Sequence, residues 1–521
     1  MDPNQSNFLD KYFELFSSND VEGFSENLKK CLVATDVQLE DPIDNHRHYR
    51  YLVNYLSQED QGLKVKLILL EKHYTSESYL EDYSNYYYKS YKNFKKHCIR
   101  LHFFGETITH EEFLEAILNC NLSSDNGKYS PFWNSYKGYV VVKPLPRGII
   151  GATVLKHYET SAERKYTVLN EYPINIFGKK LKINTLPFQE QDASVSNCAS
   201  SALWSCFHHT SYLFKSKILS PSAIILNGGG FDNNLSRKYF PSVGMDLFQI
   251  SSAILAADLF CEIRTQKNFI RDQRIYTAFI YAYLRMGIPV LVGYQYEKTK
   301  DLHLVVLSGY KFSSSKLNIK ESKVAFNLMS DKICKFYSHD DQLGPFSRLE
   351  LIDEGGYLHI PPFEEVDTKL DLKTSTWIDL GNSNETFKAK LTAVIVPISK
   401  KIGRAFEGIF KEAMLLFDKY KLNKSFHADI FIIQSSNYKI EILDEIENID
   451  SITKRNCMLF FDSLPEYIWV IKIYKNDDLY CDFLFDAIDA VNSKSFSRNI
   501  YHPLFIEHLK KLDLESIFSK E

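Results

Sequence analysis

The stretch QEQDASVSNCASSALW, residues 189–204, decides the fold of the central part of the chain. After Cys198, apolar residues recur at the spacing of one face of an α-helix, at positions 199, 202, 203, 206 and 207. This pattern predicts a helix over 198–214, with Cys198 in its first turn and Ser196 or Asn197 as its N-cap. The start of a helix presents unpaired backbone N–H groups and a partial positive charge, which favour a thiolate over a thiol. The sequence therefore predicts a reactive sulfur at position 198.

A thiolate nucleophile needs a partner that handles its proton, and His303 is the candidate. It opens the strand-like run HLVVLSGY, which is separated from another strand-like run, at 289–296, by the polar segment EKTKD. Two such runs around a short polar turn predict a β-hairpin. A hairpin strand can hold the imidazole of His303 against the start of the helix at Cys198.

A carboxylate that orients the imidazole would complete the set. The strand-like run that begins at Lys332 ends at Asp340, within FYSHDDQLGP. Asp340 is our candidate for this role, and Asp341 and His339 are the alternatives. Taken singly, the three residues are ordinarily a buried thiol, a strand histidine and a turn aspartate, but their order and their structural contexts together favour a site.

At these residues the sequence resembles the papain-like cysteine peptidases, and it looks closest to the bacteriocin-leader, double-glycine peptidase-like branch. The resemblance rests on a Gln and an Asp upstream of NCASSALW, on GIPVLV before HLVVLSGY, and on DDQLGP. It covers roughly residues 186–350, about a third of the chain. It implies that Cys198 is the nucleophile, His303 the general acid and base, and Asp340 the orienting carboxylate.

The reaction that this resemblance implies is acyl transfer through a thioester. Cys198 would attack an amide carbonyl, and His303 would protonate the leaving amine and then activate water. In this family a Gln ahead of the nucleophile donates to the oxyanion, together with the backbone N–H of the Cys. Gln191 is our candidate for that role, and Gln189 is the alternative. Transglutaminases and amidases use the same order of groups, and a catalytically inactive peptidase fold could serve as a binding module, so these functions stay open.

The fold class predicted for the whole chain is α+β, because helix-like and strand-like patterns alternate irregularly. A length of 521 residues suggests several domains. We expect an N-terminal α+β unit at 1–185 for recognition or regulation, a papain-like peptidase unit at 186–365 and a C-terminal α+β unit at 366–521. The first unit would begin with a helix over 7–16. The third would contain a strand over 391–398 and a helix over 402–420 that packs on its sheet.

Composition narrows the classes of function. Lys and Arg number 62 and Asp and Glu 66, so the formal net charge of −4 makes no general case for binding nucleic acid or an anionic membrane. The start of the chain lacks a secretory signal pattern, and no apolar stretch approaches the roughly 18 residues needed to span a bilayer. The nine cysteines include no CxxC pair and are odd in number, which fits a reducing cytoplasm better than disulfides or a zinc site.

We therefore expect a cytoplasmic, bacterial-type, multidomain enzyme without a metal or cofactor. Its partners would be a protein or peptide substrate and a regulatory protein, and we do not expect a membrane or nucleic acid among them. A triggered effector, for example in antiviral defence against phage, is an extension of this view.

Three further features have other interpretations. His208 and His209 are adjacent on the predicted helix, so their rings should diverge and not share a metal. Asn227 precedes three glycines, but the Lys-Ser/Thr of a phosphate-binding loop is missing, which favours a loop beside the site. The tyrosine-rich segment 79–94 precedes lysines, and it indicates a helix packed by its tyrosines rather than a surface that stacks single-stranded nucleic acid.

Overall fold

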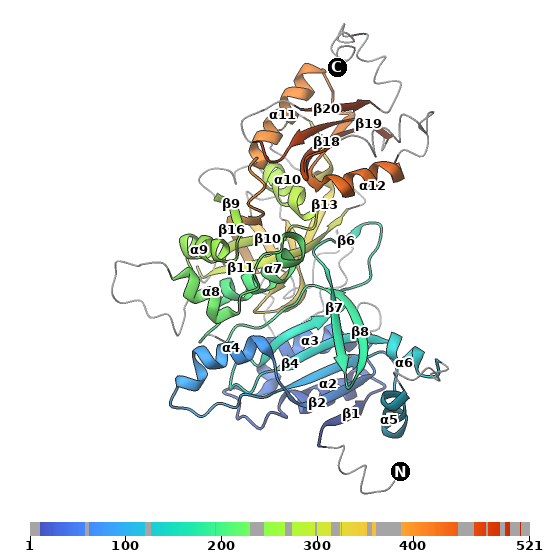
Figure 1. The fold of residues 1–521 in the computed structure, drawn as a ribbon, viewed down its shortest axis with the longest axis vertical. Coiled ribbons are helices and arrows are strands. Elements are labelled where there is room, and N and C mark those ends of the chain that lie inside the picture. The colour runs from blue at the N-terminus through green and yellow to red at the C-terminus, as the bar shows by residue number, and fades with distance from the viewer. Residues whose placement is uncertain are drawn as a thin grey trace.

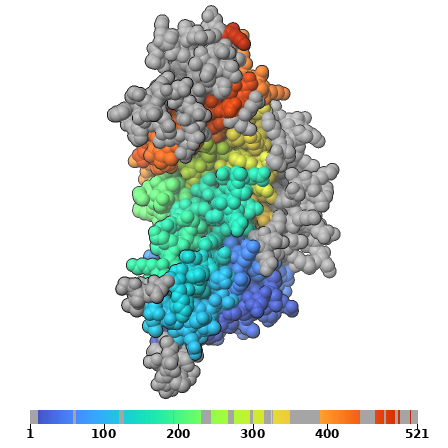
Figure 2. Space-filling model, turned by 90° about the vertical axis from the view of Figure 1, so that its right-hand side faces the viewer, coloured from blue at the N-terminus to red at the C-terminus, as the bar shows by residue number. Residues whose placement is uncertain are grey.

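The structure is a computed structural model, and its helices and strands mix along the chain in an α+β arrangement, as predicted. The N-terminal and C-terminal sheets lie toward opposite ends of the long axis, with the central sheet between them (Figure 1). Figure 2 shows the same succession as colour bands on one face of the molecule. The residues that the structure describes are 11–57, 62–119, 127–192, 194–229, 244–265, 273–296, 300–313, 324, 326–351, 357–360, 387–445, 463–475, 478–489, 495–500 and 511.

The N-terminal unit is built on a five-stranded antiparallel sheet whose strands follow chain order. Its strands are β1 (Phe13–Ser17), β2 (Leu67–Tyr74), β3 (Cys98–Phe104), β4 (Tyr136–Val142) and β5 (Ile150–Leu155). Its helices are α2 (Val21–Leu32), η1 (Ile43–Asn45), α3 (Arg47–Ser57), α4 (Glu77–Asn85), η2 (Tyr87–Lys89), α5 (His110–Asn119) and α6 (Ser130–Asn134). A separate hairpin follows, made of β7 (Asn170–Ile176) and β8 (Lys179–Thr185).

The predicted helix over 7–16 is wrong for the part that the structure describes, because Phe13–Ser17 form the strand β1. Residues 7–10 lie outside the described ranges. β1 pairs with β2 from Phe13 to Ser17, and the Phe13 ring packs against Phe113 with their centroids 5.1 Å apart. Pairing with a distant strand and burial of Phe13 outweigh the local helical pattern.

The central unit places its helices against a sheet that closes on itself. β10 pairs with β11 and also with β16, so the antiparallel pairings run in a circuit through β10, β11, β13, β14, β15 and β16. β9 adds to the edge of β16, and β6 pairs with β11. The strands are β6 (Arg164–Tyr166), β9 (Phe260–Thr265), β10 (Val290–Tyr296), β11 (Leu302–Phe312), β13 (Ile333–Asp340), β14 (Gly344–Leu351), β15 (Tyr357–Ile360) and β16 (Phe387–Ile398). The helices are α7 (Cys198–Phe214), α8 (Pro221–Gly228), α9 (Leu247–Ala256) and α10 (Gln273–Leu284).

The C-terminal unit has a five-stranded sheet in the order β12-β17-β18-β19-β20. Its elements are β12 (Asn327–Leu328), η3 (Met329–Lys332), α11 (Phe406–Lys419), β17 (Phe426–Gln434), α12 (Ser435–Glu445), β18 (Tyr467–Lys475), β19 (Asp478–Asp486) and β20 (Ser497–Ile500). The predicted helix packs on this sheet, since Phe406 of α11 meets Trp469 of β18 with ring centroids 6.1 Å apart.

The domain boundary expected at residue 366 is wrong for β16. This strand pairs with β9, β10 and β15 and so belongs to the central sheet. Conversely, β12 lies within the range expected for the peptidase unit, 186–365, but pairs with β17 of the C-terminal sheet. One continuous cluster of buried side chains joins all three units and includes Phe24, Phe207 and Trp469. Among the helices of the described ranges, none is both long and apolar enough to cross a bilayer.

Candidate active site

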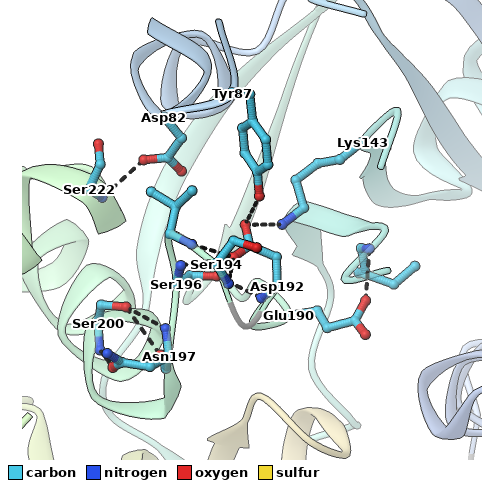
Figure 3. A network of polar contacts seen from close by, with 12 residues as sticks. Asp82, Tyr87, Lys143, Glu190, Asp192, Ser194, Ser196, Asn197, Ser200 and Ser222 are labelled. Carbon is cyan, nitrogen blue, oxygen red and sulfur yellow. Dashed lines mark hydrogen bonds and ion pairs between the residues drawn. The ribbon is translucent and has the colours of Figure 1, made fainter. Parts of the chain in front are cut away.

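Cys198 is the first residue of α7, as predicted, and Asn197 is the N-cap. The Asn197 side chain accepts a hydrogen bond from the N–H of Ser200 at 3.0 Å, and the Ser200 hydroxyl accepts one from the N–H of Asn197 at 2.9 Å (Figure 3). This reciprocal cap fixes the backbone geometry at the N-terminal end of the helix. The half-buried Cys198 thus lies at the positive end of a 17-residue helix.

The segment before Cys198 is folded around the carboxylate of Asp192. Its Oδ1 accepts three backbone N–H groups within 3.0 Å, those of Ser194, Val195 and Ser196. The N–H of Asp192 in turn donates to the hydroxyl of Ser196 at 2.9 Å. Figure 3 shows this tight turn directly before the start of α7. The backbone path into Cys198 therefore depends on one buried carboxylate.

The N-terminal unit holds that carboxylate from the other side. Tyr87 donates its hydroxyl to Oδ2 of Asp192 at 2.7 Å, and Nζ of Lys143 lies 3.7 Å from the same oxygen (Figure 3). Burial acts to raise the pKa of Asp192, but Lys143 and the donated hydrogen bonds hold it below its usual value. Asp192 therefore stays charged in the interior, where its donors satisfy it.

His303 lies on β11, in the hairpin that was predicted, and its ring is buried. Nε2 is 3.0 Å from Oδ1 of Asp340, at the end of β13. Cys198 acts on this ring as well, since its side chain contributes to the rise in the pKa of His303. Since Nε2 faces Asp340, Nδ1 is the nitrogen available to the thiol. The structure thus brings together the three residues that the sequence singles out.

Asp340 is fixed by two further donors. Tyr294, which pairs with His303 across the hairpin, donates its hydroxyl to Oδ2 at 3.1 Å, and the N–H of Gln342 donates to Oδ1 at 2.9 Å. Burial acts to raise the pKa of Asp340, but His303 and these hydrogen bonds lower it. Burial likewise opposes the charge on His303, yet Asp340, Asp341 and Cys198 hold the pKa of His303 well above its usual value.

Asp341 is a second carboxylate beside the same ring, with Oδ1 3.5 Å from Nε2 of His303. Burial raises the pKa of Asp341, and repulsion from Asp340 adds to the effect. The shorter contact and the two extra donors favour Asp340 as the orienting group. His339 points elsewhere, because its Nε2 faces the main-chain oxygen of Leu186 at 2.8 Å.

Among the residues that the structure describes, His303, Asp340 and Asp341 each offer a ligand atom, and these atoms lie within 4.8 Å of one another in a geometry that could hold a metal ion. Because both carboxylates already face the imidazole of His303, we assign His303 and Asp340 to the candidate triad with Cys198. The expectation of no metal and no cofactor stays a prediction. His208 and His209 are both on α7, where burial lowers the pKa of each ring to about 4.

The glutamine of the oxyanion hole stays a prediction. Nε2 of Gln189 is enclosed by protein and has no hydrogen-bond acceptor among the described residues, so an incoming carbonyl oxygen cannot reach it in this conformation. Gln191 is only partly buried. This difference in exposure favours Gln191 over Gln189.

Two other predictions have mixed outcomes. Of the segment 227–234, residues 227 and 228 end α8, and the part from 230 on lies outside the described residues. The tyrosine-rich segment forms the short helices α4 and η2. Tyr79 and Tyr87 are buried, as expected of packing tyrosines, whereas Tyr88 and Tyr91 are exposed.

Comparison with protein-family models gives no match for this chain, and no curated protein matches its sequence. The geometry of the site therefore carries the functional argument.

The sequence interpretation missed the residues around the triad. Tyr294 had a usable signal, because the predicted hairpin places it directly opposite His303. Tyr87 and Lys143 had none, since they reach Asp192 from distant positions in the chain through tertiary packing.

Proposed function

We propose that the protein is a cysteine peptidase of papain-like architecture that cleaves a peptide bond through a thioester on Cys198. The observation that carries the proposal is the buried ring of His303, whose Nε2 lies 3.0 Å from Oδ1 of Asp340 and whose pKa is raised by Asp340, Asp341 and the side chain of the half-buried Cys198. A thiol at a helix start, an imidazole and an orienting carboxylate form the constellation that activates a sulfur nucleophile.

The proposed reaction begins with His303 as an imidazolium and Cys198 as a thiolate. The Cys198 sulfur attacks the substrate carbonyl, and the oxyanion accepts hydrogen bonds from the Cys198 N–H and the Gln191 amide. His303 gives its proton to the leaving amine, which departs as the thioester forms. The neutral imidazole then takes a proton from water, and the hydroxide that forms attacks the thioester and releases the acid and the thiolate.

The peptidase proposal is tested by comparing protein termini in cells that express the wild type or Cys198→Ala. New amino termini that appear only with the wild type support cleavage and identify the substrate. A second arm adds a fluorescent amine together with glutamine-containing proteins. Amine incorporation without new termini would contradict the proposal and assign the thioester to a transglutaminase-type reaction.

Reactivity of the thiol provides a test that needs no substrate. Iodoacetamide should alkylate Cys198 faster than the other cysteines, and His303→Ala should lower that rate by about 10²-fold or more. Equal labelling of Cys198 and of surface-accessible cysteines, unchanged in His303→Ala, would indicate an inactive fold.

A further inference from the structure

His48 lies on α3 of the N-terminal unit, and its buried imidazole reaches both segments that carry the triad. Its Nδ1 is 3.1 Å from Oε1 of Glu190, and its Nε2 is 2.8 Å from the main-chain oxygen of Asp341. Glu190 belongs to the segment that leads to Cys198, and Asp341 directly follows Asp340. One side chain from outside the central unit therefore contacts both halves of the site.

The two contacts define the charge of this imidazole. Both partners of His48 are acceptors, one a carboxylate and the other a carbonyl, so both ring nitrogens must donate and the ring is an imidazolium. Burial opposes this charge, but Glu190 and Asp341 raise the pKa of His48. Burial also opposes the charge on Glu190. The pKa of Glu190 is nevertheless lowered by His48, by the N–H of Ile150 at 2.9 Å and by Lys143. His48 and Glu190 are therefore a buried ion pair.

The same helix contacts the carboxylate turn a second time, one helical turn after His48. Tyr51 donates its hydroxyl to the main-chain oxygen of Pro345. Its ring lies so close to Gly344 that a Cβ there would be 2.2 Å from Cδ1 of Tyr51. The turn between β13 and β14 is thus packed directly against α3, and this close packing fixes where His48 can reach.

We propose that His48 is a positioning residue of the triad. It couples the segment before Cys198 to the turn after Asp340, so that thiol, imidazole and carboxylate stay aligned. The inference rests on the proposed function, since it takes these groups to act together. In this proposal the N-terminal unit also helps to align the residues of the site, in addition to the recognition or regulation expected from the sequence.

The test measures the alkylation rate of Cys198 by mass spectrometry in the full chain, at a temperature where each variant is folded. His48→Phe removes both donors and should lower the rate about 10-fold, since small displacements of reacting groups are costly. His48→Gln keeps one donor and should lower it about 3-fold. Should His48→Phe fail to fold, His48→Gln carries the test.

Tyr55→Phe is the matched control, because its hydroxyl lies on the same helix but donates to the main-chain oxygen of Lys156. Rates in the His48 variants equal to the wild type would overturn the proposal.

A double-mutant cycle separates positioning from general stability. If His48 acts through the alignment of Asp340 with His303, then His48→Phe should cost little further rate in an Asp340→Asn background. The same fold-loss in both backgrounds would assign His48 a merely structural role.

The two proposals can fail separately, because alkylation requires no substrate. Fast alkylation of Cys198 that depends on His48, in a protein that produces no new termini, would leave the positioning role intact and remove the peptidase. New termini produced equally by the wild type and His48→Phe would support the peptidase and remove the positioning role of His48.

Discussion

Two clusters of buried ionisable side chains in this molecule differ in their balance of charge. The first is the candidate triad. The second lies where the end of α10 meets the C-terminal sheet, and there Arg285 Nε is 3.2 Å from Asp429 and Arg285 Nη2 is 2.7 Å from Glu441. Lys472 adds a second cation, with Nζ 2.6 Å from Glu441. Two cations face two carboxylates in this second cluster.

The charges of the first cluster, at the candidate triad, are not balanced in this way. One imidazole faces two carboxylates, Asp340 and Asp341, and its third partner is the half-buried thiol of Cys198. The charges of the second cluster neutralise one another and hold its elements together, whereas the first cluster adds a half-buried thiol beside an imidazole, which is a nucleophile that can react. The difference between the clusters therefore separates a structural role from a chemical one, and each prediction below tests it.

The largest expected effect comes from removing the sulfur. Cys198→Ala should abolish acyl transfer and the fast alkylation, with little change in stability because the residue is half-buried. Cys206→Ala is the control on the same helix. Its side chain is fully buried and burial raises the pKa of its thiol, so it should lower the free energy of unfolding by about 1 kcal/mol and leave activity in place. Activity that survives Cys198→Ala would place the chemistry elsewhere.

The second cluster should respond in the opposite way. Arg285→Met leaves Asp429 buried beside an apolar side chain and should lower the free energy of unfolding by about 3–5 kcal/mol. Denaturant titration measures this change. Lys411→Met, which removes an exposed pair with Glu407, should change it by less than about 0.5 kcal/mol. Neither variant should alter the alkylation rate of folded Cys198, and a strong loss of that rate in Arg285→Met would contradict the division of roles.

The two carboxylates beside His303 should not be equivalent. Asp340→Asn removes the largest of the contributions that raise the pKa of His303, and should lower the alkylation rate of Cys198 at neutral pH about 10-fold, because a hydrogen bond to a charged group is worth about 1.5–3 kcal/mol. Asp341→Asn should have a much smaller effect, because burial already favours the neutral form of Asp341. The reverse ranking would assign the orienting role to Asp341.

The pH dependence follows from the same shifts. The pKa of His303 is raised in the folded state, so its contribution to stability is present below about pH 6.5 and is lost as pH rises through the raised value. The pKa of Asp340 is lowered, so its contribution is present above about pH 4 and is lost as pH falls through the lowered value. Acyl transfer measured against pH should therefore decline on the alkaline side, as His303 loses the proton that it gives to the leaving amine. In Asp340→Asn that decline should begin at a lower pH, and an unchanged profile would show that Asp340 does not act on His303.

The parts of the site that could be predicted from the sequence are those determined by local pattern. The helix predicted over 198–214 has the bounds of α7, and the hairpin and the strand that ends at Asp340 are present in the structure. These elements carry Cys198, His303 and Asp340, so the positions of the three candidate residues could be predicted from the spacing of apolar residues and the breaks between them.

The parts that could not be predicted depend on pairing between distant segments. β16 closes the circuit of the central sheet by pairing with β10 and β15, and the sequence pattern of β16 itself does not indicate which strands it pairs with. His48 likewise reaches Glu190 from a different unit. An amphipathic pattern indicates which face of an element is buried, but tertiary packing decides which element covers it.

The smallest expected effect tests the hydroxyl of Tyr294, which donates to Oδ2 of Asp340 at 3.1 Å. Tyr294→Phe keeps the ring, whose centroid lies 5.3 Å from that of His303, and removes one neutral donor from a carboxylate that also accepts from Gln342. The loss of such a bond is worth about 1 kcal/mol, so the alkylation rate should fall about 3- to 5-fold with little change in stability. In an Asp340→Asn background the same substitution should have no effect on the rate, because the acceptor charge is already gone. A full additive loss there would mean that Tyr294 acts on His303 through its ring and not through Asp340.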